Sequence, residues 1–226
     1  MKLLAIETSG PVAGAAMCVD GCIRAEEFTN TRLTHSETIL PMAERVLAAA
    51  GYRCTELDAV AVDIGPGSFT GIRIGVSAAN AIAFAAKAQV IGVDSLHCLY
   101  ANAIGWTESI LTAIDSGNGR VYAAQFNKTK RQELTSAIYF GEFEDWLASV
   151  ARDREFLFLG DSKGMWKERI MAHSCKIAIA GPALCVHHAS SLAVIAYDKL
   201  LRGETTKEAQ PFYIAKPKAE RDLQHE

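Results

Sequence analysis

The sequence predicts an α/β protein with two lobes related by internal duplication, each a mixed sheet flanked by helices. Two observations lead to this prediction. Strand-like and helix-like runs alternate along the 226 residues, and one strand–turn–strand form recurs in the second half. Half of the residues are hydrophobic and 22% are charged, which is sufficient for a sizeable core. We place an N-terminal lobe for dimerisation and partner binding at 1–108, and a smaller C-terminal lobe with a tail at 109–226.

The first lobe is expected to open with three strands and to continue as alternating helices and strands. The strands are LLAIET, AGAAMCVD and CIRAEEFT, the last two joined by the tight-turn dipeptide Asp20–Gly21. Apolar residues at helical spacing and a capping box from Thr34 to Glu37 predict a helix over residues 34–50. The apolar run LDAVAVDI is typical of a buried parallel strand. A glycine-rich turn and a second helix follow it, and then the strand QVIGVDS and the short helix SLHCLYANAI.

The second half begins as the first half does. The run LTAIDSGNGRVYAAQF (111–126) repeats the form of LLAIETSGPVAGAAM (3–17), so Glu7 and Asp115 occupy the same place in the two copies. In each copy an apolar strand ends in Ala-Ile-acid, turns through Ser and Gly, and returns as a strand. Chance is the alternative for so short a match, but the order of elements independently suggests a duplication.

Two α/β lobes that each open with an acid-bearing hairpin resemble the actin-like ATPase fold, which is ribonuclease H-like. In that fold the hairpin turns flank the nucleotide phosphates, and the acids hold a metal ion or its water. The resemblance marks Glu7, Ser9, Asp115 and Ser116 as vestigial phosphate or metal positions. Turn N–H groups suit phosphate and carboxylates suit hard cations. The alternative is that the acids only accept hydrogen bonds from the hairpin backbone.

The turn in GPGSFTGIRIGVSAANAIA is the most specific local signal in the chain. It lacks the lysine of a phosphate-binding loop, and Thr70 stands where a dinucleotide fingerprint has its third glycine. Pro66 fixes the entry of the chain into the turn, and Ser68 is a suitable N-cap for the helix that follows. We therefore interpret Gly65, Pro66, Gly67 and Ser68 as a structural glycine turn.

This string, with LDAVAVDI before it and VIGVDSL after it, closely resembles the bacterial TsaB (YeaZ) family. The resemblance extends over LLAIETS, THSETILPM and DSGNGRVYAAQF. It implies a cytoplasmic accessory subunit in the system that forms threonylcarbamoyladenosine in tRNA: a non-catalytic scaffold and activator that binds the catalytic paralogue TsaD. It also implies TsaE, an ATPase, as a further partner and a homodimer when the chain is alone. The tRNA is then contacted only through the complex, no membrane is involved, and the chain has no cofactor of its own. ATP or ADP at an interface shared with the partners is left open.

Small residues recur every four positions along the second predicted helix and form a smooth stripe. Such a stripe packs closely either on the chain's own sheet or on another chain. Because the resemblance implies pairing through the N-terminal helices, we predict that the stripe and the apolar side of the first helix form the partner interface. The predicted interface residues are Ile39, Met42, Val46, Ala50, Gly71, Gly75 and Ala79.

Two other functions are weighed against the scaffold, an ATP-dependent small-molecule kinase and a metallopeptidase. The Gly-Gly adenosine turn of actin-like sugar kinases is absent. Ile39 stands four residues after His35, so the His-x-x-x-His pair that TsaD carries is missing, and His187 and His188 are adjacent rather than helically spaced. We therefore expect no metal and no catalytic residues.

The composition further limits the kinds of partner and the compartment that we expect for the protein. A net charge of −3 and a pI near 6.1 argue against autonomous RNA binding, which needs a basic face. The six cysteines include no C-x-x-C pair. We also find no signal peptide and no apolar run long enough to span a bilayer, and a reduced, cytoplasmic protein is the expectation.

Overall fold

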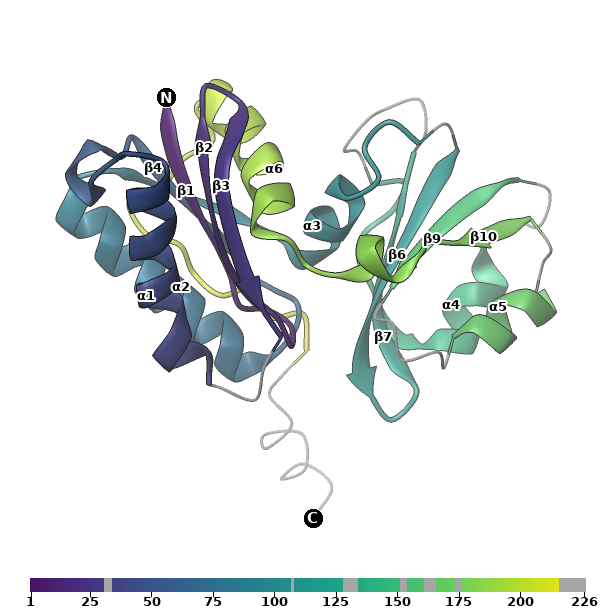
Figure 1. Cartoon of the computed structure of the whole chain (residues 1–226). Helices are drawn as coiled ribbons and strands as arrows, with labels where there is room; N and C mark the ends of the chain where they lie inside the picture. The colour runs from purple at the N-terminus through teal and green to yellow at the C-terminus, as the bar shows by residue number, and fades with distance from the viewer. Residues whose placement is uncertain are drawn as a thin grey trace, which may run out of the picture.

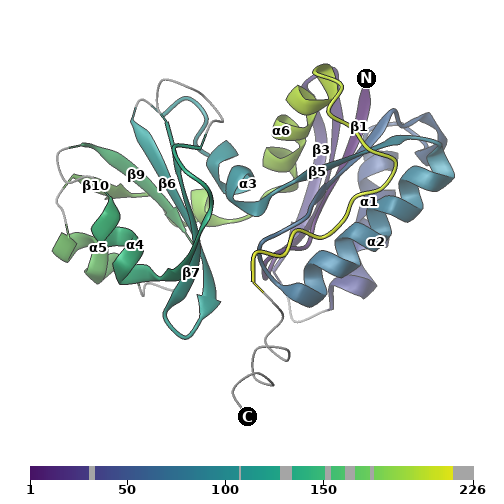
Figure 2. The ribbon, with the colours of Figure 1, turned by 180° about the vertical axis from the view of Figure 1, so that it is seen from behind.

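The computed structural model describes residues 1–30, 34–106, 108–127, 134–150, 154–160, 166–173 and 176–215. These residues form two five-stranded mixed sheets, with helices between the sheets and on their outer faces (Figure 1, Figure 2). The predicted class, two α/β lobes with mixed sheets flanked by helices, is confirmed.

The first sheet has the order β3-β2-β1-β4-β5. Its β1–β2 and β2–β3 pairs are antiparallel, and its β1–β4 and β4–β5 pairs are parallel. Helices α1 (His35–Ala49) and α2 (Phe69–Ala86) cover its outer face. The strands are β1 (Lys2–Glu7), β2 (Ala13–Val19), β3 (Cys22–Thr29), β4 (Ala59–Asp63) and β5 (Gln89–Val93).

The second sheet repeats this arrangement strand for strand. Its order β10-β9-β6-β7-β8 has the β6–β7 and β7–β8 pairs antiparallel and the β6–β9 and β9–β10 pairs parallel. The hairpin β6–β7 thus corresponds to β1–β2, as an internal duplication requires. The elements are β6 (Ser109–Gly117), β7 (Arg120–Phe126), β8 (Tyr139–Glu142), α4 (Phe143–Ser149), β9 (Phe156–Gly160), α5 (Lys167–His173) and β10 (Ile177–Ile179).

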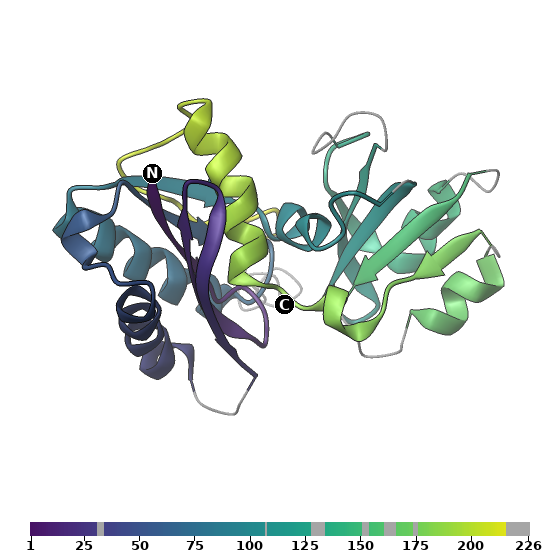
Figure 3. The ribbon, with the colours of Figure 1, turned by 45° about the horizontal axis from the view of Figure 1, so that its top comes forward.

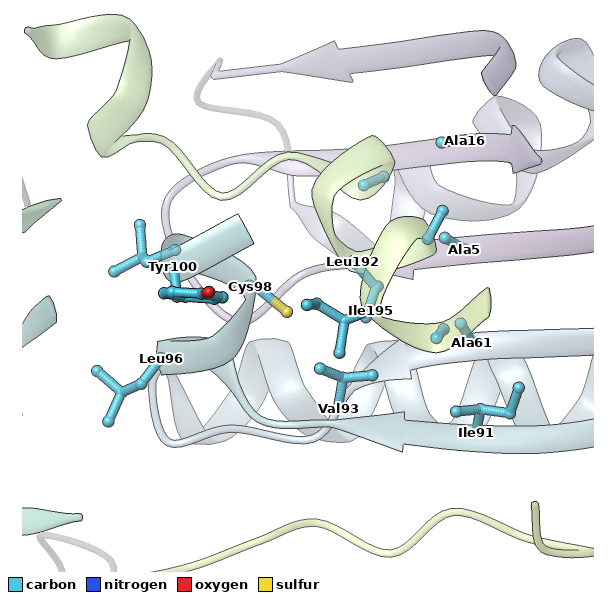
Figure 4. Packing of buried hydrophobic residues seen from close by; sticks show 14 of the residues in the cluster. Ala5, Ala16, Ala61, Ile91, Val93, Leu96, Cys98, Tyr100, Leu192 and Ile195 are labelled. Carbon is cyan, nitrogen blue, oxygen red and sulfur yellow. The ribbon is translucent and has the colours of Figure 1, made fainter. Parts of the chain in front are cut away.

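Two helices fill the space between the sheets. Helix α3 (Ser95–Ala101) packs on β6 and against α6 (Ala189–Leu201), and α6 lies on β1 and β2. The inner face of the first sheet is rich in alanine, so it needs large side chains from another element to complete a core. Figure 4 shows Leu192 and Ile195 of α6 supplying them over Ala5 and Ala61. One continuous apolar core therefore joins the two lobes.

The predicted division of the chain differs from the structure after residue 188. Residue 108 does lie between α3 and β6, but α6 returns to the first sheet (Figure 3). The segment after α6 then runs along β5, where Thr206 pairs with Val90, and Phe212 N donates to Ile64 O at 2.8 Å. Residues 189–215 therefore complete the first lobe, because its alanine-rich face would otherwise lack a cover.

The local signals around the two outer helices are confirmed. Glu37 Oε2 accepts a hydrogen bond from Thr34 N at 3.3 Å in the expected capping box, and Ser68 Oγ caps α2 by accepting from Gly71 N at 3.2 Å. By length and composition α2 is apolar enough to cross a membrane, with a mean hydropathy of 1.3. Its buried side nevertheless packs on β4, as expected of the covering helix of a globular core.

Candidate functional site

A cavity of ≈ 640 Å³ lies at the carboxyl ends of the parallel strands, where the two lobes meet. Both acid-bearing hairpins, the glycine turn, the segment before α6 and the segment 212–215 line it. Ligands of open α/β sheets bind at this edge of the strands. The structure thus brings together predicted positions from all three motifs: Ser9, Pro66, Gly67, Ser68, Asp115 and Ser116.

The two hairpin acids have equivalent local contacts. Glu7 Oε1 accepts a hydrogen bond from Ser9 N at 2.6 Å, and Asp115 Oδ1 accepts one from Gly117 N at 2.8 Å. Each acid therefore bonds the backbone two residues ahead, the simpler of the two roles considered for it. Glu7 is fully buried, whereas Asp115 is half-buried at the cavity wall.

Glu7 also belongs to a buried polar group that we call the Glu7 cluster: Glu7, Ser9, Asp63 and His187. Ser9 Oγ lies at its centre, 2.7 Å from Glu7 Oε1, 3.0 Å from Asp63 Oδ2 and 2.8 Å from His187 Nδ1. Asp63 is held in turn by Gly65 N at 2.8 Å and Ser95 Oγ at 2.6 Å, both donating to Oδ1. The cluster thus joins the ends of β1 and β4 to the segment that enters α6.

Burial dominates the electrostatics of this cluster. It raises the pKa of Glu7, against the hydrogen bonds from Asp63 and Ser9. It raises the pKa of Asp63 well above the usual value, and the neighbouring charge of Glu7 adds to this effect, while His187 and Ser95 oppose it. Two neighbouring carboxylates in a buried site cannot both ionise without a large cost in free energy. The Glu7–Asp63 pair therefore retains a proton when no other group neutralises its charge.

Sequence reasoning selected Glu7 and Ser9 but missed Asp63 and His187. Asp63 ends the apolar strand run directly before the glycine turn, and an acid at that place was an available signal. His187 carries no such signal, since its contact with the acids depends on the return of the chain to the first sheet. The neighbouring His188 is the N-cap residue of α6.

Most of the predicted interface positions are wrong, because they are buried against the chain's own sheet; Ile39, although buried, also lines the groove described below. Ile39, Met42, Val46, Gly71, Gly75 and Ala79 are all buried within the first lobe. A methyl group on Gly71 would overlap the carbonyl oxygen of Thr8, and one on Gly75 would overlap the Thr8 hydroxyl. The small-residue stripe therefore lets α2 approach the backbone at Thr8, directly after the end of β1, closely. Among the predicted positions only Ala50 is partly exposed.

The solvent side of the same two helices carries a different apolar surface. A groove between α1 and α2, which we call the α1–α2 groove, is lined by Leu40, Phe69, Arg73, Ile74, Ala78 and Ala81, among others. Leu40 is 51% exposed, and Phe84 further along α2 is 89% exposed. The guanidinium of Arg73 lies 3.9 Å from the centre of the Phe69 ring. Exposed apolar side chains around a groove are typical of a docking surface.

Two lobes of one topology with a cleft at the strand ends define an actin-like ATPase fold. A solved ROK hexokinase from Thermus thermophilus has this arrangement, with a TM-score of 0.50 and 13% identity over 90% of this chain and all of that chain, which is a likeness of fold alone. A much better match is YeaZ from Pseudomonas aeruginosa, with a TM-score of 0.80 and 26% identity over 94% of this chain and 99% of that chain.

Sequence comparison identifies the family. The family model described as TsaD, tRNA N6-adenosine threonylcarbamoyltransferase, matches residues 28–220. The tRNA threonylcarbamoyladenosine biosynthesis protein TsaB of Bacillus subtilis is 31% identical over 75% of each chain. Its Escherichia coli counterpart is 34% identical over 63% of this chain, and the match spans 60% of the Escherichia coli protein's length. The chain belongs to the TsaB (YeaZ) family.

Proposed function

We propose that the chain is a non-catalytic scaffold and activator subunit in tRNA threonylcarbamoyladenosine biosynthesis, and that it binds a catalytic TsaD subunit through the α1–α2 groove. The observation that carries this proposal is the exposed apolar surface of α1 and α2 on a member of the TsaB family. The proposed function follows from membership of the TsaB family, and the groove is the proposed site of association.

The contacts of the glycine turn support a role without catalysis. Ser68 N donates to Ser9 O at 2.7 Å, and Gly65 N donates to the Asp63 carboxylate. Two N–H groups that the turn could offer to a phosphate are therefore already used by the protein itself. No lysine or arginine occurs among the described residues that line the cavity, so neither of these two cationic side chains is available there to offset the charge of a nucleotide. Both features weigh against the small-molecule kinase.

The groove has the composition of a binding surface for another protein. Most of its lining side chains are apolar, and Arg73 also lines it; Tyr213 Oη accepts a hydrogen bond from Arg73 Nε at 3.0 Å. Aromatic residues and arginine are enriched where interfaces gain most of their affinity. We further propose that the same surface mediates a homodimer when TsaD is absent.

The remaining parts of the proposal concern the assembly. The subunit acts in the cytoplasm, with TsaE as a further partner, and any nucleotide binds at an interface shared with the partners. The net charge of −3 favours contact with tRNA through the assembled complex rather than through this chain alone.

The test compares Leu40→Asp with Met171→Asp in a titration calorimetry experiment against purified TsaD. Met171 is 65% exposed on α5 of the second lobe, so it is a matched control far from the groove. We expect Leu40→Asp to weaken binding at least tenfold, since a desolvated charge at the centre of an interface is costly, and Met171→Asp to bind as the wild type does. Both variants should keep the wild-type melting temperature. Equal affinity of all three proteins would rule out the groove, and no binding by the wild type would rule out the scaffold function.

A further inference from the structure

The Glu7 cluster contains a set of donor atoms that the proposed scaffold function does not use. Glu7, Asp63 and His187 each offer one ligand atom, and these atoms all lie within 4.8 Å of one another. His187 Nδ1 is 3.8 Å from Glu7 Oε1 and 3.9 Å from Asp63 Oδ2. We propose that these three side chains bind one divalent transition-metal ion, and that Zn²⁺ fits them best.

The geometry needs only a small adjustment to hold such an ion. Donors about 2.1 Å from a tetrahedral Zn²⁺ stand about 3.4 Å from one another. The His187–Glu7 and His187–Asp63 separations exceed this value by about half an ångström, which a change in the χ angles of His187 can provide. The Glu7 and Asp63 donor atoms lie within 4.8 Å of each other, so rotation of a carboxylate must close any remaining excess. Ser9 Oγ already lies within 3.0 Å of all three donors, so it either becomes the fourth ligand or turns away.

A second, independent observation at the same place is the state of the Glu7 carboxylate. The Glu7 side chain is fully buried, and its Oε2 has no hydrogen-bond partner. A buried carboxylate oxygen without a partner is costly. An ion bound by the Glu7 carboxylate would supply the positive charge that this oxygen lacks.

The surroundings fit the requirements of a metal ligand set. The two donors to Asp63 Oδ1, Gly65 N and Ser95 Oγ, hold the carboxylate so that Oδ2 faces His187 and Glu7. Groups that orient a ligand in this way are a regular part of metal sites. Ser9 and His187 line the cavity, which gives an ion a route from solvent. One imidazole with two carboxylates suits Zn²⁺ or Mn²⁺ better than Mg²⁺, which prefers oxygen ligands and retained waters.

The competing explanation is a purely protonic cluster. In that case Glu7 and Asp63 share a proton, and the Ser9 hydroxyl, which can donate only one hydrogen bond, links them to His187. Such a cluster is satisfied without a metal and binds none. The two explanations therefore make opposite predictions for metal stoichiometry.

The test uses the full chain, stripped with a chelator and titrated with Zn²⁺ in a calorimeter and with Co²⁺ in a spectrophotometer. We expect one ion per chain. The Co²⁺ form should show d–d bands without a sulfur-to-cobalt charge-transfer band, because the ligands are nitrogen and oxygen. This readout excludes adventitious binding to thiols such as the exposed Cys22.

His187→Ala should lower the affinity for Zn²⁺ at least tenfold, while His188→Ala serves as the matched control and should bind as the wild type does. Glu7→Gln keeps the shape of the side chain, and it should also weaken binding if His187→Ala does not fold. The proposal is overturned if the wild type binds no ion saturably, if a charge-transfer band appears, or if the folded variants retain full affinity. The outcome does not depend on whether the chain binds TsaD.

Discussion

Gly75→Ala is expected to destabilise the protein, although the same exchange in an exposed helix is stabilising by about 1 kcal/mol. The new methyl group would overlap the Thr8 hydroxyl and would lie 3.5 Å from Val62 Cγ2. Thr8 is buried, and its hydroxyl donates to Gly71 O at 2.8 Å. Relieving the overlap turns this hydroxyl away, and overpacking together with the lost hydrogen bond costs about 2–3 kcal/mol. After the gain in helix propensity, the expected net loss in the free energy of unfolding is about 1–2 kcal/mol.

The assay is urea unfolding of the wild type, Gly75→Ala, Thr8→Ala and the double variant. If the Thr8 hydroxyl is the obstacle, Gly75→Ala becomes neutral or stabilising, by up to about 1 kcal/mol, in the Thr8→Ala background. Gly71→Ala should be equally destabilising in the wild type and in the Thr8→Ala background, because its methyl group would overlap the backbone carbonyl of Thr8, which that substitution does not remove. Ala81→Gly, at an exposed position of the same helix, should cost about 1 kcal/mol in both backgrounds. Equal destabilisation by Gly75→Ala in both backgrounds would refute the reasoning.

Two further predictions concern the C-terminal segment and the thiols. Asn80→Ala should lower the free energy of unfolding by about 1–3 kcal/mol in the same assay, because the Asn80 side chain donates to Ala209 O and accepts from Ala209 N; an unchanged midpoint would show that this segment adds nothing to stability. In a thiol-labelling time course followed by peptide mass spectrometry, Cys22 should react quickly because it is exposed, and Cys98 should react only on unfolding, since burial raises its pKa well above the ordinary value. Equal labelling rates at the two positions would contradict the packing of α3.

The sequence predicted correctly those structural features that depend on only a few neighbouring residues. The capping box at Thr34 and the N-cap at Ser68 each depend on contacts over three residues, and both form as expected. The repeated hairpin is likewise local, and the two sheets built on it have the same strand order. Because these features do not depend on what packs against them, the sequence was sufficient to predict the fold class.

The sequence did not predict which part of the structure packs against a given side of a helix. The four-residue spacing of Gly71, Gly75 and Ala79 shows that they share one side of α2, and it predicts a close approach to another backbone. It does not say whose backbone approaches. In the structure the answer is the backbone directly after β1, at Thr8, because the helix must first cover its own sheet. The surface that we propose for docking is the opposite side of the helix pair, which includes the exposed Leu40. The four-residue spacing of small residues gives no indication of this surface.

The Glu7 cluster was predictable in part. Glu7 and Asp63 end adjacent parallel strands, and the carboxyl ends of such strands meet at one edge of the sheet, so their proximity follows from the predicted topology alone. His187 joins them only because α6 leaves the second lobe to cover the alanine-rich face of the first sheet. The same return of the chain that completes the hydrophobic core thus places an imidazole beside two buried acids. A cation held there would tie β1 and β4 to the start of α6, and chelation should then lower the melting temperature of the wild type but not that of His187→Ala.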